Sequence, residues 1–193
     1  NRSKKWRTRV SSEFNSATQS GLYHASADIS KEKWGSLTSF SFSQFGDIRM
    51  GANRTHGYKD WGLSNYYSEN TSHYFKEEQT LNPHPNIQRN TGYSQYDFLQ
   101  KFLVQLRGNH QLLFNLQYST SSNINRFDKL NENKEGMLRF SEWYYGPQTW
   151  FLGNLKINHR SRSEFYDKIQ FTGAYQYFGE SRNDRDFGEP ILF

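Results

Sequence analysis

The chain contains no cysteine and no long hydrophobic run, and each absence removes a class of structure. Without cysteine among 193 residues, neither a disulfide framework nor a thiolate metal site is possible. No stretch approaches the roughly 20 consecutive apolar residues that a membrane-spanning helix needs, so none is expected. The first residues also lack the apolar segment of a signal peptide. We interpret this as removal or truncation, because nothing in the chain favours the cytoplasm.

Aliphatic residues are scarce as well, whereas aromatic residues are abundant. Hydrophobic residues make up only 34% of the chain, yet aromatic residues make up 18%. Disordered chains are poor in aromatic residues, and soluble cores favour Leu, Ile and Val. A membrane barrel with a wet interior and rings of Tyr and Trp at both interfaces reconciles these values. The net charge of +5 comes from scattered basic residues, so no nucleic-acid partner is expected.

Two runs, Thr91–Arg107 and Gln111–Ser122, alternate apolar and polar residues over an unusual length. Soluble strands average about five or six residues, whereas a strand that crosses a bilayer needs roughly 9–11. Barrel strands also place apolar side chains toward lipid and polar side chains toward the lumen. The pattern therefore predicts an outer-membrane β-barrel. A three-residue turn, Gly108–His110, keeps both apolar rows on one face by pairing Leu106 with Leu112.

The sequence predicts an all-β fold, an antiparallel transmembrane β-barrel segment with about seven long strands. Bacterial barrels have even strand numbers, so we interpret the chain as part of a larger barrel. From the second predicted strand onward, long connections, Gly46–Asn90 and Asn123–Ser141, alternate with short ones, whereas the first connection, Asn15–Ala17, is short and adds no support. This alternation is typical of extracellular loops and periplasmic turns. The predicted strands are Lys5–Phe14, Thr18–Ile29, Lys33–Phe45, Thr91–Arg107, Gln111–Ser122, Glu142–Ile157 and Tyr166–Glu180.

Four sequence blocks carry a resemblance to a known family. They are GSLTSFSFSQFGDIRMGANRTHG (Gly35–Gly57), NTGYSQYDFLQKF (Asn90–Phe102), LQYSTSSNINRFDKL (Leu116–Leu130) and LRFSEWYYGPQ (Leu138–Gln148). In this order they resemble the first part of the barrel of TonB-dependent receptors from Bacteroidetes-type bacteria. The resemblance implies that residues 1–193 are a partial barrel domain, without the plug domain, the TonB box and the remaining strands.

The family has a barrel of about 22 strands in the outer membrane, closed by an N-terminal plug. The resemblance thus implies contact with outer-membrane lipid and, through the absent plug region, with the TonB complex. It implies import of a scarce small ligand, such as an iron-siderophore, haem, cobalamin or a glycan, with TonB-derived energy. No resident cofactor is expected. Haem and a ferric siderophore stay among the options for the transported ligand.

The long loop Gly46–Asn90 contains the candidate ligand-binding residues. Aromatic side chains supply contact area, and a neutral imidazole is able to ligate haem iron; the alternative is simple loop packing and solvent exposure. Haem receptors of a related group carry a loop His between FRAP-like and NPNL-like motifs. Asn82–Ile87 resembles only the second motif, and superficially. The candidates are His56, Tyr58, Trp61, Tyr66, Tyr67, His73, Tyr74 and His84.

Other polar and aromatic groups have predicted structural roles. Asp97, Lys101 and Arg107 are expected to face the lumen and the plug. Asp47 and Arg49 are expected to pair at the base of the long loop, and Asp128 is expected to lie in a solvated loop. Indole and phenol rings prefer the headgroup level of a membrane. The predicted interface girdle is Trp143, Tyr144 and Tyr145.

No catalytic or metal-binding motif is present, so the protein is expected to be a transporter and not an enzyme. Two other functions stay open. One is a soluble secreted β-sandwich whose surface aromatic residues bind carbohydrate, which requires strands of about six residues and a closed core. The other is an outer-membrane enzyme of lipase or protease type, which requires a nucleophile and a base at the barrel rim.

Overall fold

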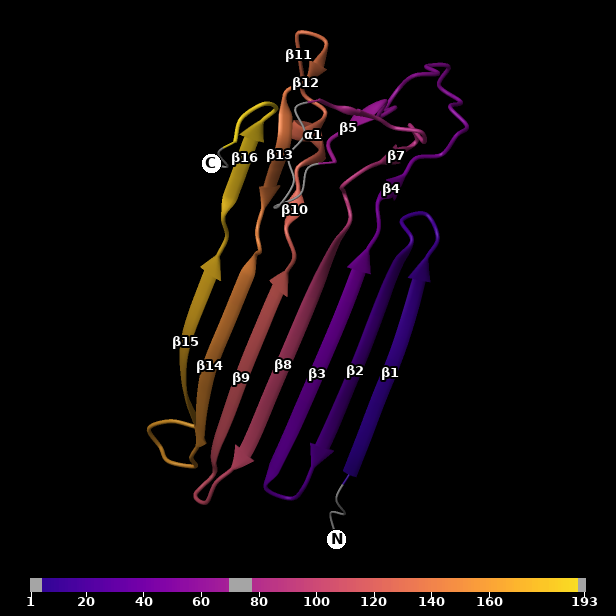
Figure 1. Ribbon diagram of the computed structural model, residues 1–193. Coiled ribbons are helices and arrows are strands. Elements are labelled where there is room, and N and C mark those ends of the chain that lie inside the picture. The colour runs from indigo at the N-terminus through magenta and orange to yellow at the C-terminus, as the bar shows by residue number, and fades with distance from the viewer. Residues whose placement is uncertain (1–4, 70–77, 191–193) are drawn as a thin grey trace.

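The computed structural model describes residues 5–69 and 78–190, which form one large antiparallel sheet with an assembly of loops at one end (Figure 1). Strands of 11–13 residues lie side by side in the sheet, which confirms the all-β antiparallel prediction. Among the described residues the sheet is open, because the first and last strands each have one neighbour. In sheet order the strands are β1 (Lys5–Asn15), β2 (Ser20–Ser30), β3 (Trp34–Phe45), β8 (Tyr93–Gln105), β9 (His110–Ser121), β14 (Thr149–Arg160) and β15 (Lys168–Gly179).

The connections sort by length to the two ends of the sheet (Figure 1). Three short turns, at residues 31–33, 106–109 and 161–167, lie at what we call the turn end. The long connections between β3 and β8 and between β9 and β14 lie at the opposite end, the loop end. The alternation expected from the sequence is therefore confirmed. The short β1–β2 connection also lies at the loop end.

The β8–β9 turn has the predicted length but not the predicted position. Val104 pairs with Leu112, and the Leu106 N–H donates to the His110 carbonyl at 2.8 Å. The turn is therefore residues 107–109, one residue earlier than expected. Gly108 and Asn109 have φ values of 69° and 61°, and such left-handed residues belong inside a turn. The pairing shifts by two residues, so the apolar rows stay on one face.

The predicted strand Glu142–Ile157 is wrong, because it is two strands. The first part belongs to β13 (Phe140–Tyr145), and β14 begins only at Thr149. Gly146, with φ of 126°, and Pro147 separate them. Proline lacks a backbone N–H and restricts the residue before it, which ends β13 there. β13 pairs instead with β10 (Ile124–Asn125) and β16 (Arg182–Asp186) in a separate three-stranded sheet.

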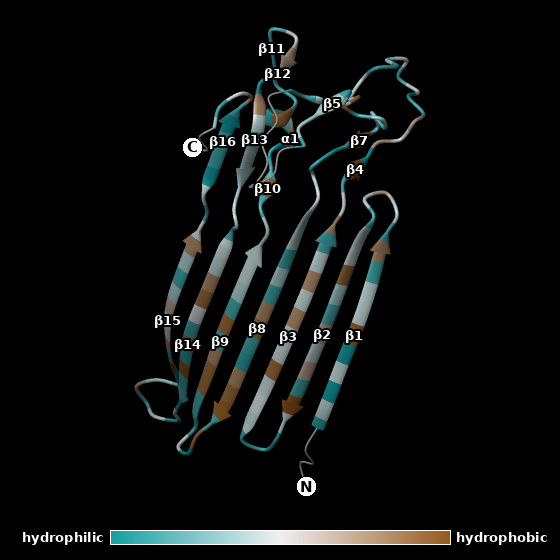
Figure 2. Cartoon of the chain, viewed as in Figure 1, coloured by the Kyte–Doolittle hydropathy of each residue, from teal (hydrophilic) through white to brown (hydrophobic). Residues whose placement is uncertain are grey.

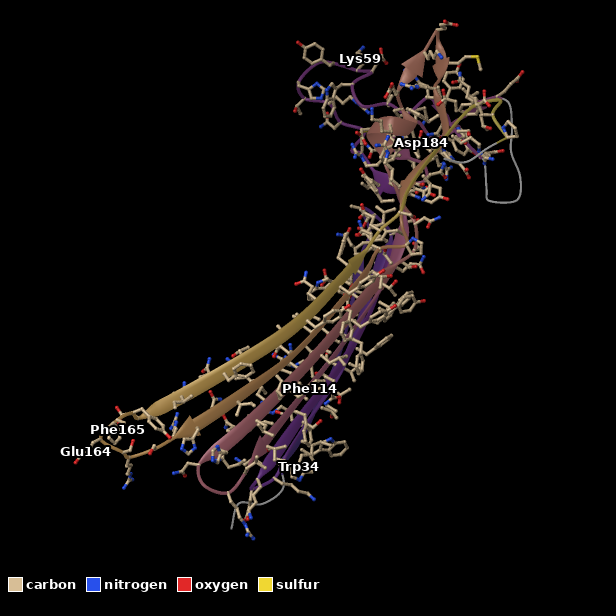
Figure 3. The ribbon with its side chains drawn as sticks, turned by 90° about the vertical axis from the view of Figure 1, so that its left-hand side faces the viewer. Trp34, Lys59, Phe114, Glu164, Phe165 and Asp184 are labelled. Carbon is tan, nitrogen blue, oxygen red and sulfur yellow. The ribbon has the colours of Figure 1, made fainter. Side chains whose placement is uncertain are left out.

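The remaining elements are short and complete the loop assembly. Its core contains Leu130, Phe140 and Trp143, with Tyr145 packed against them, whereas the large sheet is a single curved layer (Figure 3). No helix in the described ranges is long and apolar enough to span a membrane. The elements are β4 (Ile48–Arg49) with β7 (Ile87–Gln88), β5 (Tyr66–Tyr67) with β6 (Thr80–Leu81), α1 (Phe127–Leu130), and β11 (Asn133–Lys134) with β12 (Met137–Leu138).

Candidate functional site

The large sheet has one apolar and one polar face. Its register runs without a bulge from β1 to β15, so alternate residues of every strand share a face. Hydropathy accordingly alternates in bands along the strands (Figure 2). We call apolar face the side that contains Trp6, Val10, Phe14, Tyr23, Ala25, Ala27, Ile29, Trp34, Phe40, Phe42, Tyr96, Phe98, Phe102, Val104, Leu112, Phe114, Leu116, Tyr118, Phe151, Leu155, Ile157, Ile169, Phe171, Tyr175 and Tyr177.

Charge separates the two faces completely. All ten Asp, Glu, Lys and Arg residues of the seven strands lie on the polar face, and none lies on the apolar face. A charged side chain in contact with hydrocarbon is costly, so a face without any charge is suited to an apolar environment. The ten are Lys5, Arg7, Arg9, Glu13, Asp28, Asp97, Lys101, Lys156, Arg160 and Lys168.

The apolar face carries large exposed side chains. Val10 is 81% exposed, Phe171 62% and Phe114 41%. With strands about 4.8 Å apart and about 3.3 Å per residue, the face has an area on the order of 1,000 Å². The largest apolar patch of a typical soluble monomer is about 300–600 Å². The size of the face therefore calls for an apolar environment or a partner.

Polar side chains on the apolar face bind one another. The Thr38 hydroxyl donates to the Gln100 side-chain oxygen at 2.6 Å, and the Gln100 amide donates to the Ser36 hydroxyl at 2.9 Å. The same amide donates to the Lys101 carbonyl at 3.0 Å. Because an unpaired polar group is costly outside water, this internal pairing lowers the cost of placing Gln100 among apolar residues.

Aromatic rings stack across strands on the apolar face. The Phe42 ring lies 4.8 Å from the Tyr96 ring and 6.2 Å from the Tyr23 ring, measured between centroids. Closer to the turn end, the Trp34 and Phe102 rings are 5.8 Å apart. Such pairs stabilise a sheet by roughly 0.2–1 kcal/mol each. They also place Tyr near the loop end and Trp near the turn end of the face.

The predicted lumen-facing residues divide into two groups. Asp97 lies on the polar face, where it accepts hydrogen bonds from the Ser119 hydroxyl at 2.7 Å and the Gln95 amide at 3.1 Å. Lys101 lies on the same face, opposite Asn115. Arg107 lies outside β8, in the β8–β9 turn, so its predicted position in the strand is wrong.

The structure brings three of the candidate ligand residues together in the long loop. The His56 ring lies 5.6 Å from the Tyr58 ring and 5.4 Å from the Trp61 ring, measured between centroids. Tyr58 is 72% exposed and Trp61 67%. Arg54 holds this segment, since its guanidinium donates to the Trp61 carbonyl at 3.1 Å and to the Asn86 side chain at 2.7 Å. The three rings form an exposed aromatic platform.

The hydrogen bonding of His56 opposes haem ligation in this conformation. Its Nδ1 atom accepts the Tyr58 N–H at 3.1 Å, so the neutral ring carries its proton on Nε2. A ring nitrogen that ligates iron needs a free lone pair. Ligation through Nε2 therefore requires the bond to Tyr58 to break.

The other described candidate ligand residues lie elsewhere in the loop assembly. Tyr66 and Tyr67 form β5, and Arg89 lies over the Tyr67 ring at 5.8 Å. His84 is exposed in the connection between β6 and β7. His73 and Tyr74 lie outside the described residues.

The NPHPNI segment, Asn82–Ile87, has a structural role that the sequence did not reveal. Asn82 is 3% exposed. Its side-chain amide donates to the Ser64 and Ile87 carbonyls at 2.8 and 3.0 Å, and its oxygen accepts the His84 N–H at 3.1 Å. A buried Asn that joins three backbone groups fixes a loop. The available signal was the pair of prolines that confines this segment.

The loop base is also fixed differently from the prediction. The expected Asp47–Arg49 pair does not form. The Asp47 carboxylate instead accepts the N–H groups of Thr91 and Gly92 at 2.9 and 3.1 Å, and the Thr91 hydroxyl accepts the Ile48 N–H at 2.8 Å. Backbone donors lie closer to Asp47 because the two ends of the loop meet there.

Trp143 does not occupy an interface girdle. It is 3% exposed, and the Arg126 and Arg182 guanidinium groups lie 5.2 and 5.0 Å from its ring centroid. β13 belongs to the loop assembly, so the prediction for Trp143, Tyr144 and Tyr145 is corrected to a packing role. Burial raises the pKa of Tyr144, and the nearby Glu142 charge adds to that rise.

Ion pairs surround this core. Glu142 and Arg185 pair at 2.7 Å with both side chains largely buried. Nearer the surface, a hydrogen bond from Arg126 lowers the pKa of Asp128. Hydrogen bonds from Lys129 and Arg139 lower the pKa of Glu132. Asp128, Glu132 and Glu142 are therefore each paired with a basic side chain of the chain itself.

Comparison of the chain with protein-family models, with curated proteins and with solved structures finds no match.

Proposed function

We propose that the seven-stranded sheet is part of the wall of a transmembrane β-barrel, in an outer-membrane receptor of the TonB-dependent class. One observation carries this proposal: all ten charged strand residues lie on one face, and large exposed apolar residues cover the other. Barrel strands alternate in this way, with the apolar side toward lipid. Strands of 11–13 residues are also long enough to cross a bilayer.

The connections supply an orientation for the proposed wall. In outer-membrane barrels, short turns lie on the periplasmic side and long loops outside the cell. The turn end is then periplasmic, and the loop assembly with its aromatic platform faces the outside medium. The polar face borders a wet lumen. Complete closure requires partners for the open edges of β1 and β15.

Import of a scarce ligand is the function that fits this arrangement. The platform formed by His56, Tyr58 and Trp61 offers exposed ring surface on the outer side, where a receptor first contacts its cargo. Ring surfaces bind planar or apolar parts of ligands such as siderophores, haem or sugars. Energy from a TonB complex belongs to the same proposal, through a plug that accompanies the barrel.

The alternative is a soluble β-sandwich that binds carbohydrate. A sandwich requires a second sheet about 10 Å away that covers the inner face. Among the described residues no second layer covers the apolar face, and the long strands exceed the length usual in soluble proteins. These features favour the membrane proposal.

Membrane extraction of the full-length protein tests the proposal. We expect it to sediment with outer membranes, to need detergent for solubility, and to migrate differently on gels with and without heating. Recovery of a folded, soluble monomer without detergent contradicts it. For the cargo, an absorbance scan with added haem tests histidine ligation, and the hydrogen bond of His56 predicts no Soret shift from that residue.

A further inference from the structure

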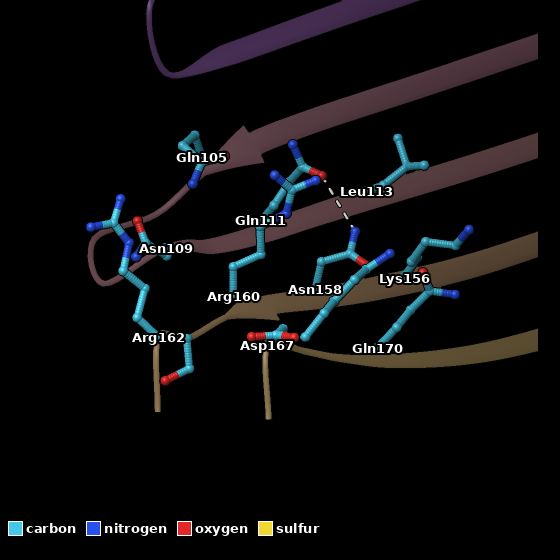
Figure 4. Close-up of a pocket in the computed structure, with 12 residues that line it drawn as sticks. Gln105, Asn109, Gln111, Leu113, Lys156, Asn158, Arg160, Arg162, Asp167 and Gln170 are labelled. Carbon is cyan, nitrogen blue, oxygen red and sulfur yellow. Dashed lines mark hydrogen bonds between the residues drawn. The ribbon is translucent and has the colours of Figure 1, made fainter. Parts of the chain in front are cut away.

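A concave basic site lies on the polar face at the turn end, away from the aromatic platform. Residues of β8, β9, β14, β15 and the turns between them enclose a volume of about 750 Å³ (Figure 4). Four of its side chains are cationic, Lys156, Arg160, Arg162 and Lys168, and one is anionic, Asp167. The lining therefore has a net charge of +3 at neutral pH.

The placement of these cations is unfavourable for the protein alone. Arg160 of β14 and Lys168 of β15 are directly opposite in the register, and like charges at opposed positions destabilise a sheet. None of the four cations forms an ion pair among the described residues. A bound anion would relieve this repulsion.

The rest of the polar face is closer to neutral, with four basic residues, Lys5, Arg7, Arg9 and Lys101, against three acidic ones, Glu13, Asp28 and Asp97. On β1 and β2, Arg7 stands opposite Asp28, and β8 carries both Asp97 and Lys101. Strands β14 and β15 contain basic residues but no acidic ones. Most of the excess positive charge on the polar face therefore lies at the concave site.

Amide groups lie beside the cations. The Asn158 amide donates to the Gln111 side-chain oxygen at 3.3 Å, and Gln105 and Gln170 also line the site (Figure 4). Guanidinium, ammonium and amide groups together are the donors that bind phosphate and carboxylate oxygens. We propose that this site binds a small molecule bearing several oxyanion groups. The inference is independent of the membrane proposal, because it concerns only this face.

Calorimetric titration of the full-length protein in detergent, with pyrophosphate and with citrate, tests the site. We expect saturable binding, and the tighter of the two ligands distinguishes phosphate from carboxylate recognition. The double variant R160Q/K168Q removes the opposed cations and should weaken binding at least about tenfold. The control R7Q/R9Q removes the same charge from β1 on the same face and should bind as the parent protein does.

Thermal unfolding provides a second readout. The tighter anion should raise the midpoint of the parent and the control, since a ligand that binds the folded state stabilises it. Without anion, R160Q/K168Q should be at least as stable as the parent. The proposal is overturned if neither anion binds saturably, or if both double variants lose binding equally.

Discussion

Ser119 donates a hydrogen bond of 2.7 Å to the Asp97 carboxylate across strands β9 and β8. The preceding residue of β9, Tyr118, faces Phe98, the residue after Asp97, on the other side of the sheet. A single step along either strand thus exchanges a member of this hydrogen-bonded polar pair for an exposed aromatic ring. The alternation of polar and apolar side chains recurs on every strand of the sheet and is the basis of the proposed membrane wall.

Neighbouring positions on β9 should differ in how much an added charge destabilises the protein. L116R places a cation on the apolar face and should lower the free energy of unfolding in lipid vesicles by about 2–4 kcal/mol. Q117R places the same cation on the polar face and should change it by less than about 1 kcal/mol. Denaturant titration of both variants measures the difference, and equal effects would rule out the assignment of the faces.

The β8–β9 turn depends on the left-handed conformation of Asn109, whose φ is 61°. A β-branched residue there is strained, so N109V should lower the free energy of unfolding by about 1–2 kcal/mol. N109G should be close to neutral, because glycine adopts this conformation without steric cost. If both variants unfold like the parent in denaturant titration, the turn does not lie at residues 107–109.

The sequence predicted the two faces well because strand alternation is local information. Tyr96, Phe98 and Phe102 identify their face without knowledge of any partner strand. The turn position depended on the backbone conformation of Gly108 and Asn109, and pairing shifted by two residues preserves the same pattern. At Gly146–Pro147 the sequence favours a kink within one strand, because apolar residues continue on both sides, whereas the structure ends β13 there.

The loop assembly was less predictable, because its contacts join residues distant in sequence. Asn82 reaches Ser64, and Trp143 lies beside Arg126 and Arg182. An aromatic triplet at Trp143 looks the same in sequence whether it meets lipid headgroups or a core. Only the pairing of β13 with β16 distinguishes the two.

Asn82 should control the order of the long loop. N82A leaves the Ser64 and Ile87 carbonyls without their donor, and each lost buried hydrogen bond costs about 1–3 kcal/mol. We expect proteolysis within residues 46–92 to become at least about tenfold faster, while the sheet stays folded. N65A removes an exposed side chain of the same loop and should leave the cleavage rate unchanged. Equal cleavage of N82A and N65A would refute this role.

The loop assembly should weaken in acid. Basic neighbours lower the folded-state pKa values of Asp128 and Glu132. The two carboxylates therefore stabilise the folded loop assembly fully at a pH above the ordinary carboxyl pKa of about 4. This stabilisation disappears as the pH falls through the lowered pKa values of the folded state. Fluorescence of a variant whose only tryptophan is Trp143 should report this acid transition. Adding D128N/E132Q to that variant should make the fluorescence less dependent on pH. An acid transition unchanged by D128N/E132Q would show that the two carboxylates do not cause it.

The most direct test of the membrane wall is a spin-label scan of β9 from Leu112 to Ser119 in the full-length protein, reconstituted in lipid vesicles. Oxygen, which concentrates in lipid, should broaden the resonance lines of spin labels at Leu112, Phe114, Leu116 and Tyr118. A water-soluble nickel complex should broaden those at the alternate positions, giving a two-residue period of opposite phase. Equal access of the nickel complex to both sets of positions would contradict the account.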